Sequence, residues 1–184
     1  DKSMTLTTDN LSYDLNTKIA TYINGGKVTD GEAVLTSVYG YYYAYTNDAY
    51  FKKDVVLKHP EYGLEADTLQ YNTDSEIAIF RGPTRIFNKE STVYCEKGYY
   101  ETNSGIAVFH QNAHLDNPPQ SLDADSIYYN RSTGIGKAFG NIIFEDTAQQ
   151  VLQYSNFAEY DEINKTIFST GGSIAGYVMD EDTL

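Results

Sequence analysis

Apolar and polar residues alternate along most of the chain, and the alternation returns at a fixed interval. Tyr13, Tyr42, Tyr71, Tyr100 and Tyr129 are each 29 residues apart. Four more columns of apolar or small residues keep this spacing: Leu6, Leu35, Leu64, Val93, Leu122 and Val151; Ala20, Ala49, Ala78, Ala107 and Gly136; Tyr22, Phe51, Phe80 and Phe109; and Val28, Leu57, Ile86, Leu115 and Phe144. Alternation at period two is typical of half-buried strands, and a fixed interval of this length is typical of stacked repeats. The pattern predicts an all-β repeat protein.

Turn-forming residues divide each repeat into two antiparallel strands. They lie at matched places: Asn16-Thr17, Asn47-Asp48, Thr73-Asp74, Asn103-Ser104, Ser132-Thr133-Gly134 and Glu162-Ile163-Asn164. A second set of breaks follows in the return strand, at Gly25-Gly26, Gly82-Pro83, Gly140 and Gly171-Gly172, and predicts bulges or bends there. The change of parity between Leu64 and Tyr71 predicts a further bulge near Asp67. Each unit is therefore strand, hairpin, strand, bend and link, with no helical stripe.

The sequence also has a longer period of 58 residues, twice the first. Units of the type E-A-D-T-L-Q-Y, residues 65–71, alternate with tyrosine-rich units such as S-V-Y-G-Y-Y-Y, residues 37–43. Asp9, Asp67 and Asp125 recur with the first type, which favours a structural role at a turn or bulge over catalysis. The last residues, D-E-D-T-L at 180–184, resemble the start of another unit. We expect one domain over residues 1–184 that is a piece of a longer protein.

One strand face is expected to form the interior. Columns 20, 22, 26 and 28 share that face, and Tyr42, Tyr71 and Tyr100 are expected to line it from the other strand. The opposite face of the tyrosine-rich stretch carries Tyr39, Tyr41, Tyr43 and Tyr45. A single unit cannot bury its apolar face alone, so several units are needed for stability.

The first type of unit resembles the repeats of the OstA/LptA family of lipopolysaccharide-transport proteins. The matching stretches are A-D-T-L-Q-Y at 66–71 and A-D-S-I-Y-Y at 124–129, with D-N-L-S-Y at 9–13 as a looser copy. Each precedes a strand similar to I-A-x-F: residues 77–80, 135–139 and 19–22 respectively. The resemblance implies a rolled, V-shaped β-jellyroll of stacked antiparallel strands. The tyrosine-rich units are similar to OstA-like proteins of Bacteroides-type bacteria.

The resemblance also implies a function. It predicts a module of the Gram-negative periplasm that takes part in lipopolysaccharide transport or assembly without catalysis, cofactor or metal. Association with the outer membrane is a further expectation. Acyl chains would lie in the apolar groove, and similar domains would pair end to end through their edge strands. The candidate groove residues are Tyr22, Tyr42, Phe51, Leu57, Tyr71, Phe80, Ile86, Tyr100, Phe109 and Leu115. Core packing alone is the competing explanation for each of them.

A column of basic residues is expected on the face opposite the interior. It comprises Lys52, Arg81 and His110, with Lys27, Arg85 and His114 four residues along the strands. This ridge is a candidate for contact with lipid phosphates, an anionic partner or an acidic face of the next protomer. A solvated surface without a partner is the alternative. His110 and His114 lie four strand residues apart, about 13 Å, which is too far for one metal ion.

Charge and composition argue against several classes of function. The chain carries 26 acidic and 13 basic residues, a net charge of −13, which argues against nucleic-acid binding. The single cysteine, Cys95, cannot form an internal disulfide. No apolar run reaches the length of about 18 residues that a membrane-spanning helix needs. Two alternatives to lipid transport stay open: a carbohydrate-binding or adhesin-like repeat domain that uses surface tyrosines, and a β-solenoid hydrolase, for which no acid–base constellation stands out.

Overall fold

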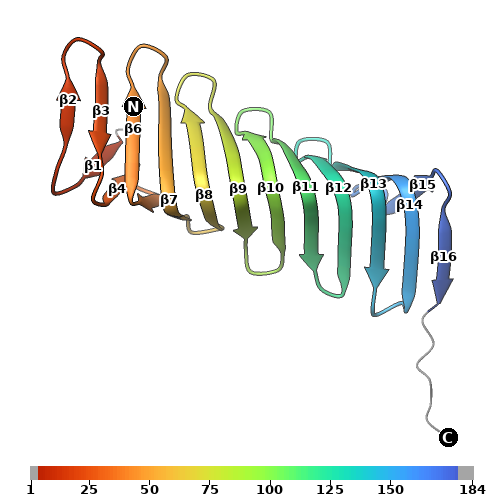
Figure 1. Cartoon of the computed structure of the whole chain (residues 1–184). Coiled ribbons are helices and arrows are strands. Elements are labelled where there is room, and N and C mark those ends of the chain that lie inside the picture. The colour runs from red at the N-terminus through yellow and green to blue at the C-terminus, as the bar shows by residue number, and fades with distance from the viewer. Residues whose placement is uncertain (1–3, 178–184) are drawn as a thin grey trace, which may run out of the picture.

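The chain forms one continuous antiparallel β-sheet, seen in a computed structural model that describes residues 4–177. Figure 1 shows the strands side by side in a long, twisted array. The short strands are β1 (Thr5–Thr7), β2 (Ser12–Asp14), β3 (Ile19–Tyr22), β4 (Gly26–Thr29), β5 (Val34–Ser37), β6 (Tyr39–Tyr43), β15 (Thr166–Thr170) and β16 (Ile174–Tyr177). The long strands are β7 (Asp48–Lys58), β8 (Gly63–Asn72), β9 (Ile77–Phe87), β10 (Thr92–Glu101), β11 (Ile106–Asn117), β12 (Gln120–Asn130), β13 (Ile135–Asp146) and β14 (Val151–Asp161). The predicted all-β fold of stacked strand–hairpin repeats is confirmed.

Every long strand is divided by a bulge into two halves, and the sheet bends along the line of these bulges. At the ends of the sheet the two halves are separate strands: β3 pairs with β2 and β6, whereas β4 pairs with β1 and β5. We call the half that contains β2, β3, β6 and β15 the tyrosine arm. The half that contains β1, β4, β5 and β16 is the leucine arm. In Figure 1 the first strands of the leucine arm, β1 and β4, lie behind the lower ends of the tyrosine arm.

The bulges follow the predicted positions and need unusual backbone conformations. Gly25, Gly82 and Gly140 have positive φ values of 95°, 83° and 71°. The units without glycine place Lys53 and Asp54, with φ values of 62° and 54°, at the same point of the fold. A register shift between Ala66 and Thr68 confirms the predicted irregularity at Asp67. These bulges preserve the inward face on both sides of the bend, because they insert two residues where the partner strand has one.

The bend is lined by deeply buried side chains, most of them small, which we call the crease row. Val55 pairs with Ala66, Ala66 with Thr84, and Thr84 with Cys95. Further along, Ala113 pairs with Ala124, and Ile142 with Ser155. Val55, Thr84, Cys95 and Ala113 are each only 1% exposed. Small side chains at the crease allow the two arms to converge.

Two further interior rows run across the sheet, one on each arm. On the leucine arm, Leu6, Val28, Leu35, Leu57, Leu64, Ile86, Val93, Leu115, Leu122 and Phe144 are successive partners. On the tyrosine arm, aromatic and small or aliphatic residues alternate: Tyr22, Gly40, Phe51, Leu69, Phe80, Gly98, Phe109 and Ile127. Residues from both rows and the crease belong to one apolar cluster, so the two arms share a single core.

Asx residues explain the 58-residue period. The side chains of Asp14, Asn72 and Asn130 each accept hydrogen bonds from backbone N–H groups two and three residues further on. Each caps a four-residue hairpin turn and directly follows the tyrosine of the D-x-L-x-Y motif. Two of the intervening units have Tyr43 and Glu101 at that place. The last of them has Asp161, which again accepts a hydrogen bond from the backbone N–H of Asn164, three residues further on.

The repeat becomes irregular near the C-terminal end. Phe144 pairs with Gln153, so Val151 lies two residues away from the leucine-arm row that its sequence spacing predicted. The aromatic residue of the fifth unit, Phe139, lies on the outer face beside Phe157, and Ala138 takes the inward position. The predicted start of another unit at 180–184 lies outside the described residues.

Candidate functional site

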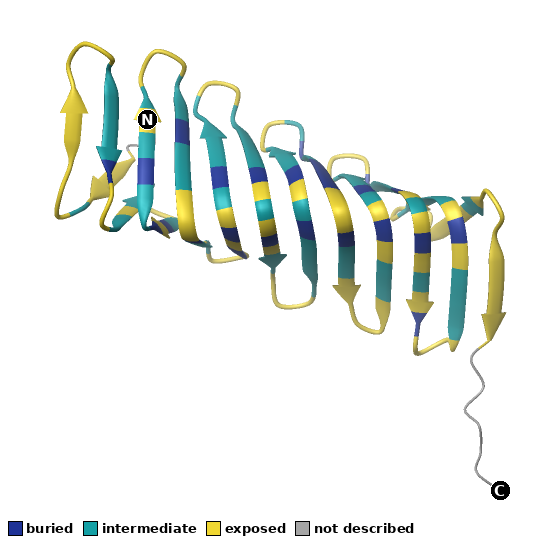
Figure 2. Ribbon diagram, in the orientation of Figure 1, coloured by how far each residue is buried: buried dark blue, intermediate teal, exposed yellow. Residues whose placement is uncertain are grey.

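The interior between the two arms is fully covered at its deepest part and more exposed at its margin. Tyr22 and Phe80 are each 3% exposed, and Phe109 is also buried. The leucine-arm residues Leu57, Ile86 and Leu115 are half-buried, as is Phe51 on the tyrosine arm. Figure 2 shows buried positions as dark segments on most of the long strands, alternating with exposed segments, and half-buried stretches toward many strand ends. The margin is therefore the more exposed part of the interior, and the deepest aromatic side chains are covered.

The interior tyrosines form a row of their own on the tyrosine arm, alternating with small residues. The row runs Tyr13, Ala20, Tyr42, Ala49, Tyr71, Ala78, Tyr100, Ala107, Tyr129 and Gly136. Tyr71 and Tyr100 are half-buried and Tyr42 is 36% exposed. The prediction that these three residues lie on the inward face is confirmed.

A loop of the leucine arm reaches toward this row. Tyr62, in the link between β7 and β8, stacks on His59 with ring centroids 4.6 Å apart. Burial raises the pKa of Tyr62, and the nearby Tyr100 hydroxyl and Asp30 carboxylate raise it further. Burial likewise raises the pKa of Tyr71, with Glu76 and Asp30 adding to the effect. Tyr62 of the leucine arm thus lies near Tyr71 and Tyr100 of the tyrosine arm, at the margin of the interior.

The basic residues predicted on the outer face do lie there, but the crease divides them. Arg85 and His114 are on the leucine arm, where Glu65 and Asp123 stand directly opposite them in the sheet. The Arg85 guanidinium lies 3.8 Å from Glu65, and His114 Nδ1 lies 2.7 Å from the Asp123 carboxylate. Lys27 lies on the same arm and is exposed. The leucine-arm half of the ridge is thus largely neutralised within the protein.

The tyrosine-arm half has a different composition. Lys52, Arg81 and His110 lie in one row, and Lys97 joins them because it pairs with both Arg81 and His110. All four side chains are exposed. The sequence columns missed Lys97, since its own column contains Tyr39, Thr68 and Ser126. Only the pairing of β10 with its neighbours reveals that it belongs to the row.

Two shallow depressions lie on this outer face, and Arg81 borders both. One, of about 430 Å³, lies between Arg81 and His110 and includes Lys97, Ile79 and Tyr99. The other, of about 450 Å³, is bordered by Tyr50, Lys52, Asp67 and Arg81.

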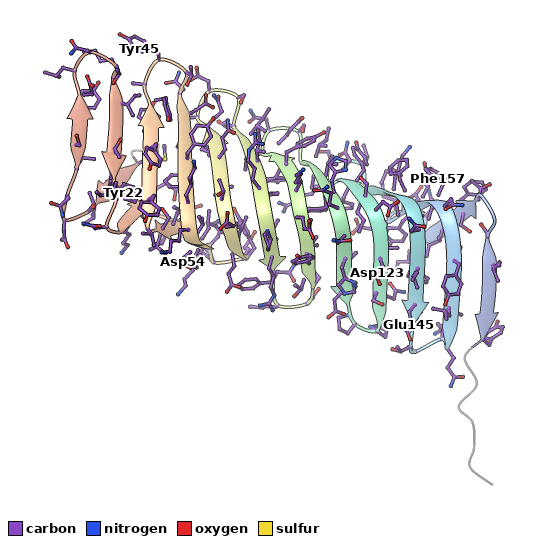
Figure 3. All side chains as sticks on the ribbon, in the orientation of Figure 1. Tyr22, Tyr45, Asp54, Asp123, Glu145 and Phe157 are labelled. Atoms are coloured by element: carbon purple, nitrogen blue, oxygen red, sulfur yellow. The ribbon has the colours of Figure 1, made fainter. Side chains whose placement is uncertain are left out.

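Outer tyrosines continue this surface toward the hairpin tips. Tyr43 and Tyr50 pack edge to face at 5.5 Å, and the Lys52 ammonium lies 5.7 Å from the centre of the Tyr41 ring. Figure 3 shows Tyr45 at the tip of the β6–β7 hairpin. Tyr39, Tyr41 and Tyr43 therefore share the outer face as predicted, whereas Tyr45 lies in the hairpin turn beyond the strand.

Residues 4–177 give little support for a metal site, a membrane-spanning helix or a reactive cysteine. No group of three or more His, Cys, Asp or Glu side chains in this part of the chain is arranged to hold a metal ion. None of the described residues forms a helix that is long and apolar enough to cross a membrane. Cys95 is buried in the crease, and burial raises the pKa of its thiol to about 11. Asp67 and Asp125 lie at the bulges, where Asp125 accepts hydrogen bonds from the Asn141 amide.

Comparison with known proteins gives a family assignment. The family model described as OstA-like protein matches residues 1–67 and again residues 63–125. No curated protein matches the chain. Among solved structures the chain is similar to LptH, described as the LptA homologous periplasmic component of the conserved lipopolysaccharide transport device from Pseudomonas aeruginosa. That similarity has 14% sequence identity and a TM-score of 0.49, and it covers 76% of this chain and 83% of LptH.

The two family matches each span about two of the 29-residue repeats, and together they cover more than half of the chain. They include the D-x-L-x-Y motifs at 9–13 and 67–71 and the crease between the arms. The chain belongs to the OstA-like family.

Proposed function

We propose that this chain is a periplasmic module of lipopolysaccharide transport or assembly, and that it holds acyl chains between the tyrosine and leucine arms. The observation that supports this best is the uninterrupted apolar row from Leu6 to Phe144 on the leucine arm. The choice of lipopolysaccharide rests on the family and on the motif resemblance.

The half-buried margin suits a flexible lipid tail. Leu57, Ile86 and Leu115 repeat at the same depth, so an acyl chain lying across the strands would meet similar surroundings in each unit. Each methylene group removed from water contributes about 0.8 kcal/mol, so a chain of ordinary length needs no specific polar contact. Such a role requires no catalytic residue and no cofactor.

The ends of the sheet support pairing with similar domains. Among the described strands, β1 and β2 each pair on one side only, as do β15 and β16. Figure 2 shows β2 and β16 exposed along their whole length. Apolar side chains are exposed there too, among them Leu11 at one end and Phe168 at the other. An unpaired strand with an apolar face favours strand addition by a further unit of the same type, from this protein or another.

Site-specific photo-crosslinking in cells tests the groove. A photoreactive amino acid is placed at Leu57, Ile86 or Leu115, and the captured material is probed for lipopolysaccharide. We expect capture at all three positions. Val56 is the matched control, because it neighbours Leu57 in sequence but points to the outer face. Failure to capture lipid at every interior position, or equal capture at Val56, would contradict the proposal.

A further inference from the structure

Three basic side chains face one another on consecutive strands of the tyrosine arm. Arg81 on β9 stands opposite Lys97 on β10, and Lys97 stands opposite His110 on β11. Lys52 lies in the same row, two strands from Arg81. We call these four residues the basic row. Within residues 4–177 none of them forms an ion pair with a carboxylate.

Arg81 and Lys97 are direct partners of like charge, and we expect this pair to lower the stability of the fold. Like charges directly opposite each other on neighbouring strands are destabilising. Acidic residues are twice as frequent as basic ones in this chain, so a counter-charge was available. On the leucine arm, the same strands β9 and β11 carry Arg85 and His114, and these two basic residues do have acidic partners, Glu65 and Asp123. The basic row lacks such partners, and an anion from outside the fold would supply the missing charge.

The surroundings of the basic row favour a saccharide over a compact ion. The two depressions beside Arg81 are shallow, and the half-buried rings of Tyr99 and Tyr50 lie at their borders. An aromatic ring offers an apolar face on which the C–H face of a sugar can pack, and its hydroxyl group offers a hydrogen bond. The carboxylates of Asp67 and Glu101 lie at the edges of the depressions, where they can accept hydrogen bonds from sugar hydroxyl groups.

We propose that the outer face of the tyrosine arm binds a phosphorylated oligosaccharide, with its phosphates on the basic row and its sugar rings on Tyr50 and Tyr99. Arg81 can hold a phosphate through two parallel N–H donors, and Lys97 adds a point charge one strand away. This site is separate from the acyl-chain groove, because the bound saccharide lies on the opposite face of the sheet. It gives a function to Tyr50 and Tyr99, which point away from the groove.

Calorimetric titration of the intact protein tests the proposal. The probe is the lipid-free, phosphorylated oligosaccharide released from lipopolysaccharide by mild acid, and the same oligosaccharide after removal of its phosphates is the comparison. We expect Arg81→Gln and Lys97→Gln each to weaken binding about tenfold, as the loss of one charge-assisted hydrogen bond does. We expect dephosphorylation to weaken binding to the unsubstituted protein by more than either substitution.

Arg85→Gln is the matched control, because it removes the same charge from the same strand and face on the other arm. We expect it to change the affinity less than twofold. Equal weakening by Arg85→Gln, equal binding of the dephosphorylated probe, or no binding of the phosphorylated probe would overturn the proposal. Salt-sensitive self-association that Lys97→Gln abolishes, without any saccharide binding, would also overturn it and assign the face to a second copy of the chain. Because the probe carries no acyl chain, none of these results bears on the groove.

Discussion

The ring of Tyr22 fills the space that a side chain at Gly40 would need. A β-carbon on Gly40 would lie 2.1 Å from a ring carbon of Tyr22, whose hydroxyl group is hydrogen-bonded to Ser37 at 2.7 Å. The ring is 3% exposed and therefore has little room to move. We expect Gly40→Ala to lower the free energy of unfolding by about 1–3 kcal/mol, as overpacking of a close-packed core does, and urea denaturation will measure this.

Gly136 provides the control for that substitution. It occupies the column of Ala20, Ala49, Ala78 and Ala107, and the nearest atoms to an added β-carbon are 3.7 Å away. Gly136→Ala should leave the stability unchanged or raise it slightly, because alanine restricts the unfolded chain. A loss as large as that of Gly40→Ala would show that contact with the Tyr22 ring is not the cause.

Stability should fall in acid through a small set of hydrogen-bonded carboxylates. The side chain of Gln120 donates to Asp146 at 2.8 Å, and this bond, with the backbone N–H of Gln149, lowers the pKa of Asp146. Asp48 has its pKa lowered in the same way, chiefly by the Asn72 amide. A folded-state pKa below the unfolded value stabilises the fold above about pH 4, and that stabilisation disappears as the pH falls through the folded pKa.

Gln120→Leu removes the first of these donors. We expect the pKa of Asp146 to rise toward its ordinary value and the acid unfolding midpoint to move to higher pH. Carbon-detected NMR titration of the Asp146 carboxyl group, together with thermal unfolding at several pH values, measures both. The pKa of Asp48 is the internal control and should not change. A constant Asp146 pKa in the variant would contradict this account.

The thiol of Cys95 should be unreactive in the native protein. Its pKa of about 11 leaves roughly one molecule in a thousand as thiolate at pH 8, and the side chain is 1% exposed. We expect a thiol-specific chromogenic reagent to react only as fast as the protein unfolds, with a rate that rises with urea in parallel with the unfolding rate. Rapid reaction without denaturant would show that the crease opens while the rest of the sheet stays folded.

Reversing the central charge of the basic row should stabilise the fold. In Lys97→Glu the new carboxylate would stand between Arg81 and His110, and the like-charge pair with Arg81 would become an attractive pair. We expect a gain of about 0.2–1 kcal/mol at low salt that decreases as salt is added, measured by thermal unfolding. Lys58→Glu is the control for the change in net charge. A loss of stability in Lys97→Glu would indicate that Lys97 has a structural partner. A gain in stability combined with a loss of saccharide binding would separate a binding role from a folding role.

Much of the architecture follows from the sequence. The 29-residue columns predicted the strands, the places of the hairpin turns and the inward face, because alternation at period two and the turn preferences of Asn, Asp and Gly act locally. The bulge near Asp67 followed from a single change of parity. The Asx caps at Asp14, Asn72 and Asn130 were missed, although their 58-residue spacing and their place directly after the tyrosine of each motif could have revealed them.

The candidate sites were harder to predict from the sequence. Tyr22, Phe80 and Phe109 share a column with Phe51, yet the first three are buried and Phe51 is not fully so, because neighbouring strands and the facing arm decide how deeply each ring is covered. The six residues of the predicted ridge lie on two separate surfaces, because the sheet bends at its bulges. The leucine-arm surface was neutralised by Glu65 and Asp123, which occupy other columns.

The sequence by itself determined the repeat, the all-β class, the inward face and the family. Only the tertiary structure decided where the sheet bends, which interior residues stay accessible, and that Lys97 stands between Arg81 and His110. The physical reason is the antiparallel hairpin. A 29-residue column joins residues on every second strand, whereas direct neighbours lie on adjacent strands at separations set by each turn and bulge. Contacts between adjacent strands, and the charge pattern that they create, therefore become visible only when the strands are paired.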